Sequence, residues 1–82
     1  MRNIILNTND IYLKEISPET AGLILAYIGD TPRFFIVYNG CEWVASMNID
    51  IVGYSYKSES LETLVRMLIN SEYITSFKLI EL

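Results

Sequence analysis

The residue types that most often perform chemistry in proteins are scarce in this chain. It contains no histidine, and its six cations are scattered singly along the sequence. Without histidine the commonest general base is absent, so a serine or cysteine nucleophile would depend on a lysine or a carboxylate. Lys57 lies near Ser58 and Ser60, but these residues precede a predicted helix, where serines cap and lysines are solvated. The sequence therefore predicts a protein that is not an enzyme.

Carboxylates and loop oxygens offer no better site. Glu59 and Glu62 project from one predicted helix three residues apart, but both oppose the positive end of its dipole, which explains them without catalysis. The oxygen-rich stretch 7–10 lacks the alternating ligands, the internal glycine and the distal glutamate of a calcium-binding loop. The four glycines are isolated, so no glycine-rich phosphate cradle is present. We expect no metal and no cofactor.

A single cysteine, Cys41, cannot form an internal disulfide, and with no histidine a structural zinc site cannot be assembled. Cys41 directly follows Asn39 and Gly40, a typical turn pair. Its position predicts a small apolar strand residue with a buried thiol.

Length and composition predict one small folded domain spanning residues 1–82. The chain has 82 residues, of which 51% are hydrophobic and 20% charged, more apolar material than a disordered segment contains. The longest unbroken apolar run, residues 21–28, is too short to span a bilayer. The apolar stretch in residues 1–7 is too short for a secretory signal, so we expect a cytoplasmic protein.

The charge balance disfavours binding to nucleic acid. Ten acidic and six basic residues give a net charge of -4, and the cations form no cluster that could neutralise phosphates. Acidity suits solubility, or a basic protein partner.

The clearest predicted element is a helix over residues 59–70. The apolar residues recur at helical spacing and form one continuous stripe: Leu61, Leu64, Val65, Leu68 and Ile69. Ser58 or Ser60 is the expected N-cap, and Glu62 and Arg66 stand four apart in the favourable order. The stripe predicts a helix that lays one face on a sheet.

The second clear element is a hairpin of strands 33–38 and 41–47 around Asn39-Gly40, which favours a type I′ turn. Alternation places Cys41, Trp43, Ala45 and Met47 on the face that meets the helix. Strand 33–38 is apolar on both sides, which suggests a central strand or a second face covered by something else.

Further strands complete the expected sheet. Residues 4–6 and 11–13 flank a polar turn and predict another hairpin. Residues 50–56 predict a short edge strand with a bulge or bend at Gly53, and residues 76–82 alternate as a closing strand.

Residues 18–28 fit two structures. Pro18 and an apolar stripe favour a helix, which would give a βαββαβ, ferredoxin-like order. Gly22 and apolar residues on every side from Leu23 onward favour a strand, which we prefer. The expected fold is α+β: a mostly antiparallel meander, one amphipathic helix packed across it, and a C-terminal closing strand.

Aromatic residues and surface carboxylates are the candidates for contact with a partner. Tyr54 and Tyr56 lie two apart, and on one face of the edge strand they would present a flat contact surface or cap the core. If the interface is electrostatic, the exposed carboxylates should gather on one face of the fold. The candidates are Glu42, Asp50, Glu59, Glu62 and Glu72.

Three classes of function follow. The first is a non-catalytic protein-binding module, in its sharper form a small acidic inhibitor of the kind that phages or mobile elements encode, such as an anti-CRISPR protein, that blocks a basic nucleic-acid-handling host protein. The second is a structural or self-associating domain, since the hydrophobic content exceeds what one small core readily buries and a homodimer would absorb the excess. A minimal enzyme is the third and least supported.

Overall fold

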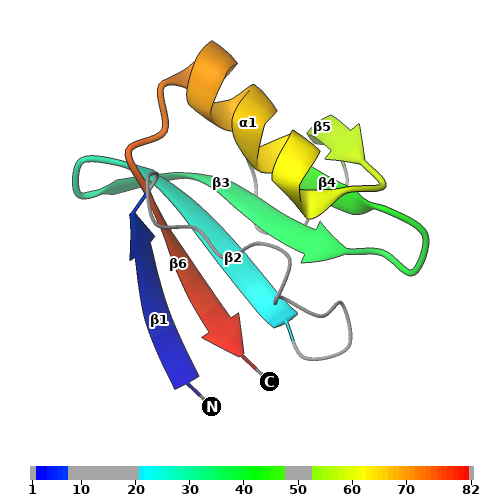
Figure 1. Cartoon of the computed structure of the whole chain (residues 1–82), viewed down its shortest axis with the longest axis horizontal. Helices are drawn as coiled ribbons and strands as arrows, with labels where there is room; N and C mark the ends of the chain where they lie inside the picture. Colours follow the sequence, from blue (N-terminus) through cyan, green and yellow to red (C-terminus); the bar gives the residue numbers. More distant parts are fainter. Residues whose placement is uncertain (1, 8–20, 48–52, 82) are drawn as a thin grey trace.

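The computed structural model describes residues 2–7, 21–47 and 53–81. They form one helix and six strands in the order β1 (Arg2–Asn7), β2 (Ala21–Ile28), β3 (Thr31–Tyr38), β4 (Trp43–Ser46), β5 (Tyr54–Ser58), α1 (Leu61–Glu72) and β6 (Ser76–Glu81). The strands make one antiparallel sheet in the order β1-β6-β2-β3-β4-β5 (Figure 1). The predicted α+β class is confirmed.

Strands β2 to β5 follow one another across the sheet as the predicted meander, and β6 returns between β1 and β2. The strand favoured over residues 22–28 is confirmed, so the ferredoxin-like alternative, which requires a helix there, is wrong. The physical reason is burial on both sides: Ile24 and Ala26 are buried on one face, while Leu23 and Leu25 are half-buried on the other. A central strand between β6 and β3 accommodates that pattern better than a helix with one apolar stripe.

Of the two strands at the ends of the sheet, β1 has a partner that local sequence did not indicate, whereas β5 pairs with the strand before it in the chain. Strand β1 pairs with β6, with Ile4 opposite Leu79, and residues 11–13, the other half of the hairpin expected there, lie outside the described residues. Strand β5 is the predicted edge strand and pairs with β4. It begins at Tyr54, and residues 50–52 also lie outside the described part of the chain.

Helix α1 begins and ends two residues later than predicted. Strand β5 continues to Ser58, whose side chain accepts a hydrogen bond from the Ser60 backbone N–H. Ser60 is the N-cap and accepts the Thr63 backbone N–H at 3.4 Å, which satisfies one of the free amides of the first turn. The predicted pair of Glu62 and Arg66 forms, at 2.7 Å.

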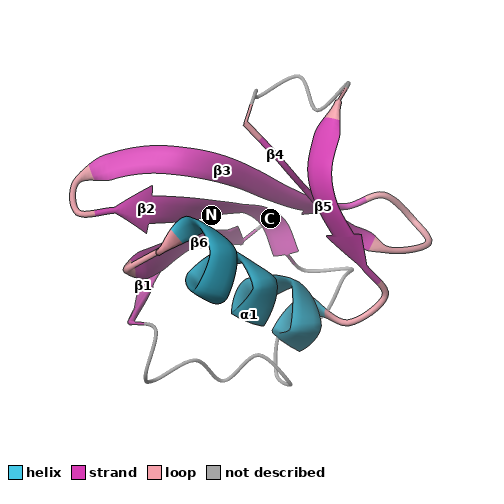
Figure 2. Ribbon diagram, turned by 90° about the horizontal axis from the view of Figure 1, so that it is seen from above, coloured by secondary structure: helices cyan, strands magenta, loops and turns pink. Residues whose placement is uncertain are grey.

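The core lies between α1 and one face of the sheet (Figure 2). The helix contributes Leu61, Leu64, Val65 and Leu68, all buried. The facing side chains of the sheet are also buried: Ile24, Ala26, Phe34, Ile36, Trp43, Ala45, Phe77 and Leu79.

The opposite face of the sheet carries apolar side chains without a covering helix or strand among the described residues. Because side chains alternate along each strand, the neighbours of the core residues point to this face. They are half-buried on β2, β3 and β6: Leu23, Leu25, Phe35, Val37 and Ile80. We call these five residues the open face.

The loop between β3 and β4 differs from the predicted type I′ turn. That turn requires positive φ at both central residues, but Gly40 has φ of 101° and Asn39 is not among the residues with positive φ. Instead, the pairing of β3 ends at Tyr38 and that of β4 begins at Trp43, so residues 39–42 form the loop between the two strands. Cys41 therefore lies in the loop and is exposed, so the prediction of a buried strand thiol is wrong.

The second strand of this hairpin is also shorter than predicted at its other end. Strand β4 ends at Ser46, and Met47, expected on the face toward the helix, is 57% exposed. Trp43 and Ala45 do lie in the core as predicted, because they remain within the paired strand.

Candidate functional site

A bulge in the edge strand separates the two tyrosines predicted to contact a partner. Ala45 of β4 pairs with Tyr56, and the next residue of β4, Ser46, pairs with Tyr54. Strand β5 therefore has one residue more than β4 in this stretch. Gly53 forms a bend, one of the two irregularities predicted there, and the bulge itself lies between Tyr54 and Tyr56. An extra residue in one strand reverses its alternation, which places the two rings on opposite faces of the sheet. The prediction that they share one face is wrong.

Tyr56 lies on the helix side of the sheet. Its ring packs edge-on against Phe34 with centroids 5.9 Å apart, and its hydroxyl donates to Glu72 Oε1 at 2.8 Å. The hydrogen bond to Glu72, with partial burial and the negative charge of that carboxylate, raises the pKa of Tyr56 above its ordinary value. Tyr56 therefore ties β5 to the C-terminal turn of α1.

Tyr54 lies on the other side of β5, where its side chain is 50% exposed. Lys57 Nζ lies 5.6 Å from the centre of the Tyr54 ring, a cation–π contact, and 3.6 Å from Glu42 Oε1. Its interactions with the Tyr54 hydroxyl and with Glu42 raise the pKa of Lys57 above its usual value. These three residues form a cluster on the same side of the sheet as the open face, because Lys57 pairs with Val44 and Val44 with Val37.

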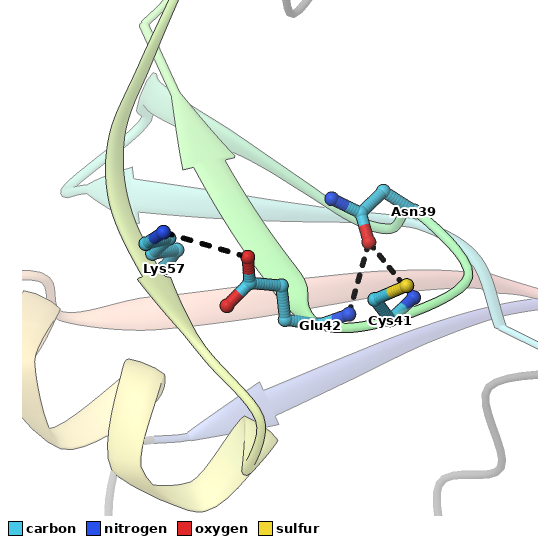
Figure 3. A network of polar contacts seen from close by, with 4 residues as sticks. All are labelled: Asn39, Cys41, Glu42 and Lys57. Atoms are coloured by element: carbon cyan, nitrogen blue, oxygen red, sulfur yellow. Dashed lines mark hydrogen bonds and ion pairs between the residues drawn. The ribbon is translucent and has the colours of Figure 1, made fainter.

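The loop 39–42 fixes Glu42 in this cluster (Figure 3). The Asn39 side-chain oxygen accepts the backbone N–H groups of Cys41 and Glu42, each at 2.9 Å. The Asn39 backbone N–H donates to the Glu42 carbonyl at 3.0 Å. Asparagine at this position therefore organises the loop through its side chain rather than through a positive φ.

The other predicted carboxylates are divided between the ends of α1. Trp43 of β4 pairs with Ser58 of β5, and Glu42 precedes the first of these residues while Glu59 follows the second. Glu62 lies in the first turn of α1. Glu42 and Glu62 are paired with Lys57 and Arg66, which offsets much of their charge. Glu72 lies at the far end of α1, and Asp50 lies outside the described residues. Within the described chain the carboxylates do not all gather on one face.

Among the described residues, no group of three or more acidic, cysteine or histidine side chains is arranged to hold a metal ion. The helix in this part of the chain lacks the length and apolar character needed to cross a membrane.

The open face was not among the candidate contact sites predicted from the sequence. Its signal in the sequence was the apolar character of both sides of residues 23–28 and 33–38, which indicates a second face but not whether that face is covered. The structure adds the position of α1 on one side alone of the described sheet (Figure 2).

No family model matches the chain, and neither the curated proteins nor the solved structures include a significant match to it.

Proposed function

We propose that this protein is a non-catalytic protein-binding module that contacts its partner through the open face and the Tyr54 cluster beside it. The observation that carries the proposal is the one-sided sheet: large apolar side chains on β2, β3 and β6 have no helix or strand over them in the described chain. Apolar patches with polar rims are typical of protein interaction sites.

The rim of this surface has the composition of an interface. Tyr54 offers a rigid ring with half of its area exposed, and Lys57 and Glu42 supply a matched pair of charges next to it. Aromatic residues are enriched at interface centres, whereas paired charges at a rim set orientation more than affinity.

The net charge of -4 favours a basic partner. In its narrower form the proposal is a small cytoplasmic inhibitor, of the phage or anti-CRISPR type, that binds a basic nucleic-acid-handling host protein. An exposed, unpaired Cys41 is compatible with a reducing compartment such as the cytoplasm.

The test compares surface variants of the tagged protein in affinity capture followed by reconstitution with the purified partner. Leu25→Asp places a charge in the open face, and Thr63→Asp places one on the exposed side of α1 as the matched control. We expect a partner that binds the parent protein and Thr63→Asp but loses binding to Leu25→Asp, provided that circular dichroism shows both variants folded. Equal binding by both variants would overturn the open face as the interface.

A second candidate function, self-association, rests on the same half-buried apolar surface. A homodimer would cover the open face with its own copy and so bury the excess hydrophobic residues. Light scattering over a concentration series distinguishes the two: a dimer that Leu25→Asp converts to a monomer supports self-association, and a monomer at every concentration excludes it.

A further inference from the structure

A hollow lies where the β2–β3 turn meets the start of β6. Its volume is about 340 Å³, and it is lined by Tyr27, Gly29, Asp30, Ser76, Phe77 and Lys78. Pockets that bind small molecules usually measure roughly 300 to 1,000 Å³, so this hollow suits a small ligand.

Hydrogen bonds through Thr75 hold the rim of the hollow together. The Thr75 backbone N–H donates to the Tyr27 carbonyl at 2.8 Å, and its hydroxyl donates to the same carbonyl at 3.2 Å. The hydroxyl oxygen also accepts the Gly29 backbone N–H at 2.9 Å. Gly29 has φ of 61°, a conformation that favours glycine, so the turn is held in one geometry beside the pocket.

The side chains around the hollow combine an aromatic wall with one cation. Tyr27 pairs with Ser76 across β2 and β6, and Lys78 lies two residues further along β6, so all three point to the same side of the sheet. Lys78 is half-buried, and within the described residues it forms no ion pair. An ammonium group without a carboxylate partner can bind an anion through charge-assisted hydrogen bonds.

We propose that this hollow binds a small aromatic carboxylate, with the ligand's carboxylate on Lys78 and its ring against Tyr27. Ser76 adds a hydroxyl donor to the same oxygen atoms. Asp30, exposed in the turn, repels an anion and so directs the charged end of the ligand toward Lys78. These side chains lie on the same side of the sheet as the open face, because Lys78 pairs with Leu25, but the inference rests on the hollow and does not require the protein-binding proposal.

The test is a nitrogen-15 NMR titration of the full chain with benzoate and, in parallel, with benzyl alcohol as a neutral ligand of similar shape. We expect saturable shifts of the Gly29, Asp30, Ser76 and Lys78 amides with benzoate and much weaker binding of benzyl alcohol. The absence of saturable shifts at these amides, or equal binding of the two ligands, would overturn the proposal. Both ligands are tested on the unaltered protein, so the result does not depend on a variant that folds.

Three variants then locate the charge that binds. Lys78→Gln should weaken benzoate binding by about tenfold or more, as expected for loss of a hydrogen bond to a charged group. Lys57→Gln, which removes a cation at the other edge of the sheet, should leave binding unchanged, and Asp30→Asn should leave it unchanged or tighten it. The proposal fails if Lys57→Gln weakens binding as much as Lys78→Gln does, or if Asp30→Asn weakens it.

Discussion

Two tyrosines two positions apart show how one extra strand residue sets the role of a side chain. Tyr56 packs against Phe34 and donates to Glu72, whereas Tyr54 is half exposed beside Lys57. Nothing in the residue types distinguishes them. The difference comes from the bulge between them, which turns one ring toward the core and the other toward the open side of the sheet.

Tyr56→Phe tests the link between β5 and α1. The variant keeps the ring packing and removes the 2.8 Å hydrogen bond to Glu72, so we expect a lower midpoint in urea unfolding. Tyr54→Phe removes a hydroxyl from an exposed ring and should change the midpoint less. Equal effects of the two substitutions would contradict the assigned roles.

The raised pKa of Tyr56 gives this link a defined pH dependence. The folded-state pKa lies above the ordinary value of 10.0, so below pH 10 both states keep the proton and the stabilisation is fully present. As the pH rises above 10, the unfolded chain loses the proton first, and the stabilisation is lost as the pH passes the folded-state pKa. The difference in unfolding free energy between the parent and Tyr56→Phe should therefore shrink above pH 10. Urea unfolding in a series of alkaline buffers measures it, and a difference that grows with pH would contradict the assignment.

At the level of elements, the C-terminus of α1 ends on an unusual residue. Tyr73 is the C-cap, with φ of 58° and ψ of 35°, and its side chain is 77% exposed. This left-handed conformation usually belongs to glycine, because a side chain there crowds the backbone. The tyrosine thus lies in a strained conformation at a position where it is also highly exposed.

Tyr73→Gly should stabilise the protein by about 0.5 to 1 kcal/mol, because relief of the left-handed strain exceeds the extra entropy that glycine adds to the unfolded chain. Asn70→Gly is the matched control: it lies on an exposed position within α1 and should cost a few tenths of a kcal/mol. Thermal or urea unfolding of both variants gives the comparison. A loss of stability in Tyr73→Gly would mean that the tyrosine ring contributes packing that its exposure does not suggest.

The elements themselves were largely predictable from sequence, and the reasons are local. The apolar stripe of α1, its Ser60 cap, the β3–β4 hairpin and the alternation of Phe77 and Leu79 in β6 all depend on residues close together in the chain. The pairing of β1 with β6 was not predictable in this way, because its partners are separated by most of the chain and turn signals favour the nearest strand.

The details of the candidate site were predicted less well, for a related reason. The side of a strand on which a residue lies changes with a single bulge or with the loop length of a hairpin, and neither has a strong local signal. The bulge places Tyr54 and Tyr56 on opposite faces of the sheet. The loop length places Cys41 outside the strand that was predicted to contain it. The carboxylates expected to gather on one face do not all do so: Glu42 is paired with Lys57 of the neighbouring strand, a contact that the sequence did not indicate, and Glu72 lies at the far end of α1.

At the scale of the whole molecule, the described residues place one helix on one side of a six-stranded sheet and no helix or strand on the other, which suggests different roles for the two faces. The helix side supplies the core and thereby the stability of the domain. A chain of 82 residues has a total free energy of unfolding of about 4 to 12 kcal/mol, so the loss of one large core side chain removes much of it. The side chains of the open face are only half-buried, so each contributes less to folding than a core side chain of the same size.

A pair of substitutions separates these roles. Leu68, fully buried in α1, should lose about 2 to 5 kcal/mol of stability on Leu68→Ala, because the helix cannot collapse completely into the cavity. Leu25→Ser on the open face removes a half-buried side chain and should cost clearly less, while it weakens partner binding or self-association. Urea unfolding measures the first effect, and binding or light scattering measures the second. If Leu25→Ser instead destabilised the fold as much as Leu68→Ala, the open face would be part of the core, and its apolar residues would be explained by folding without a partner.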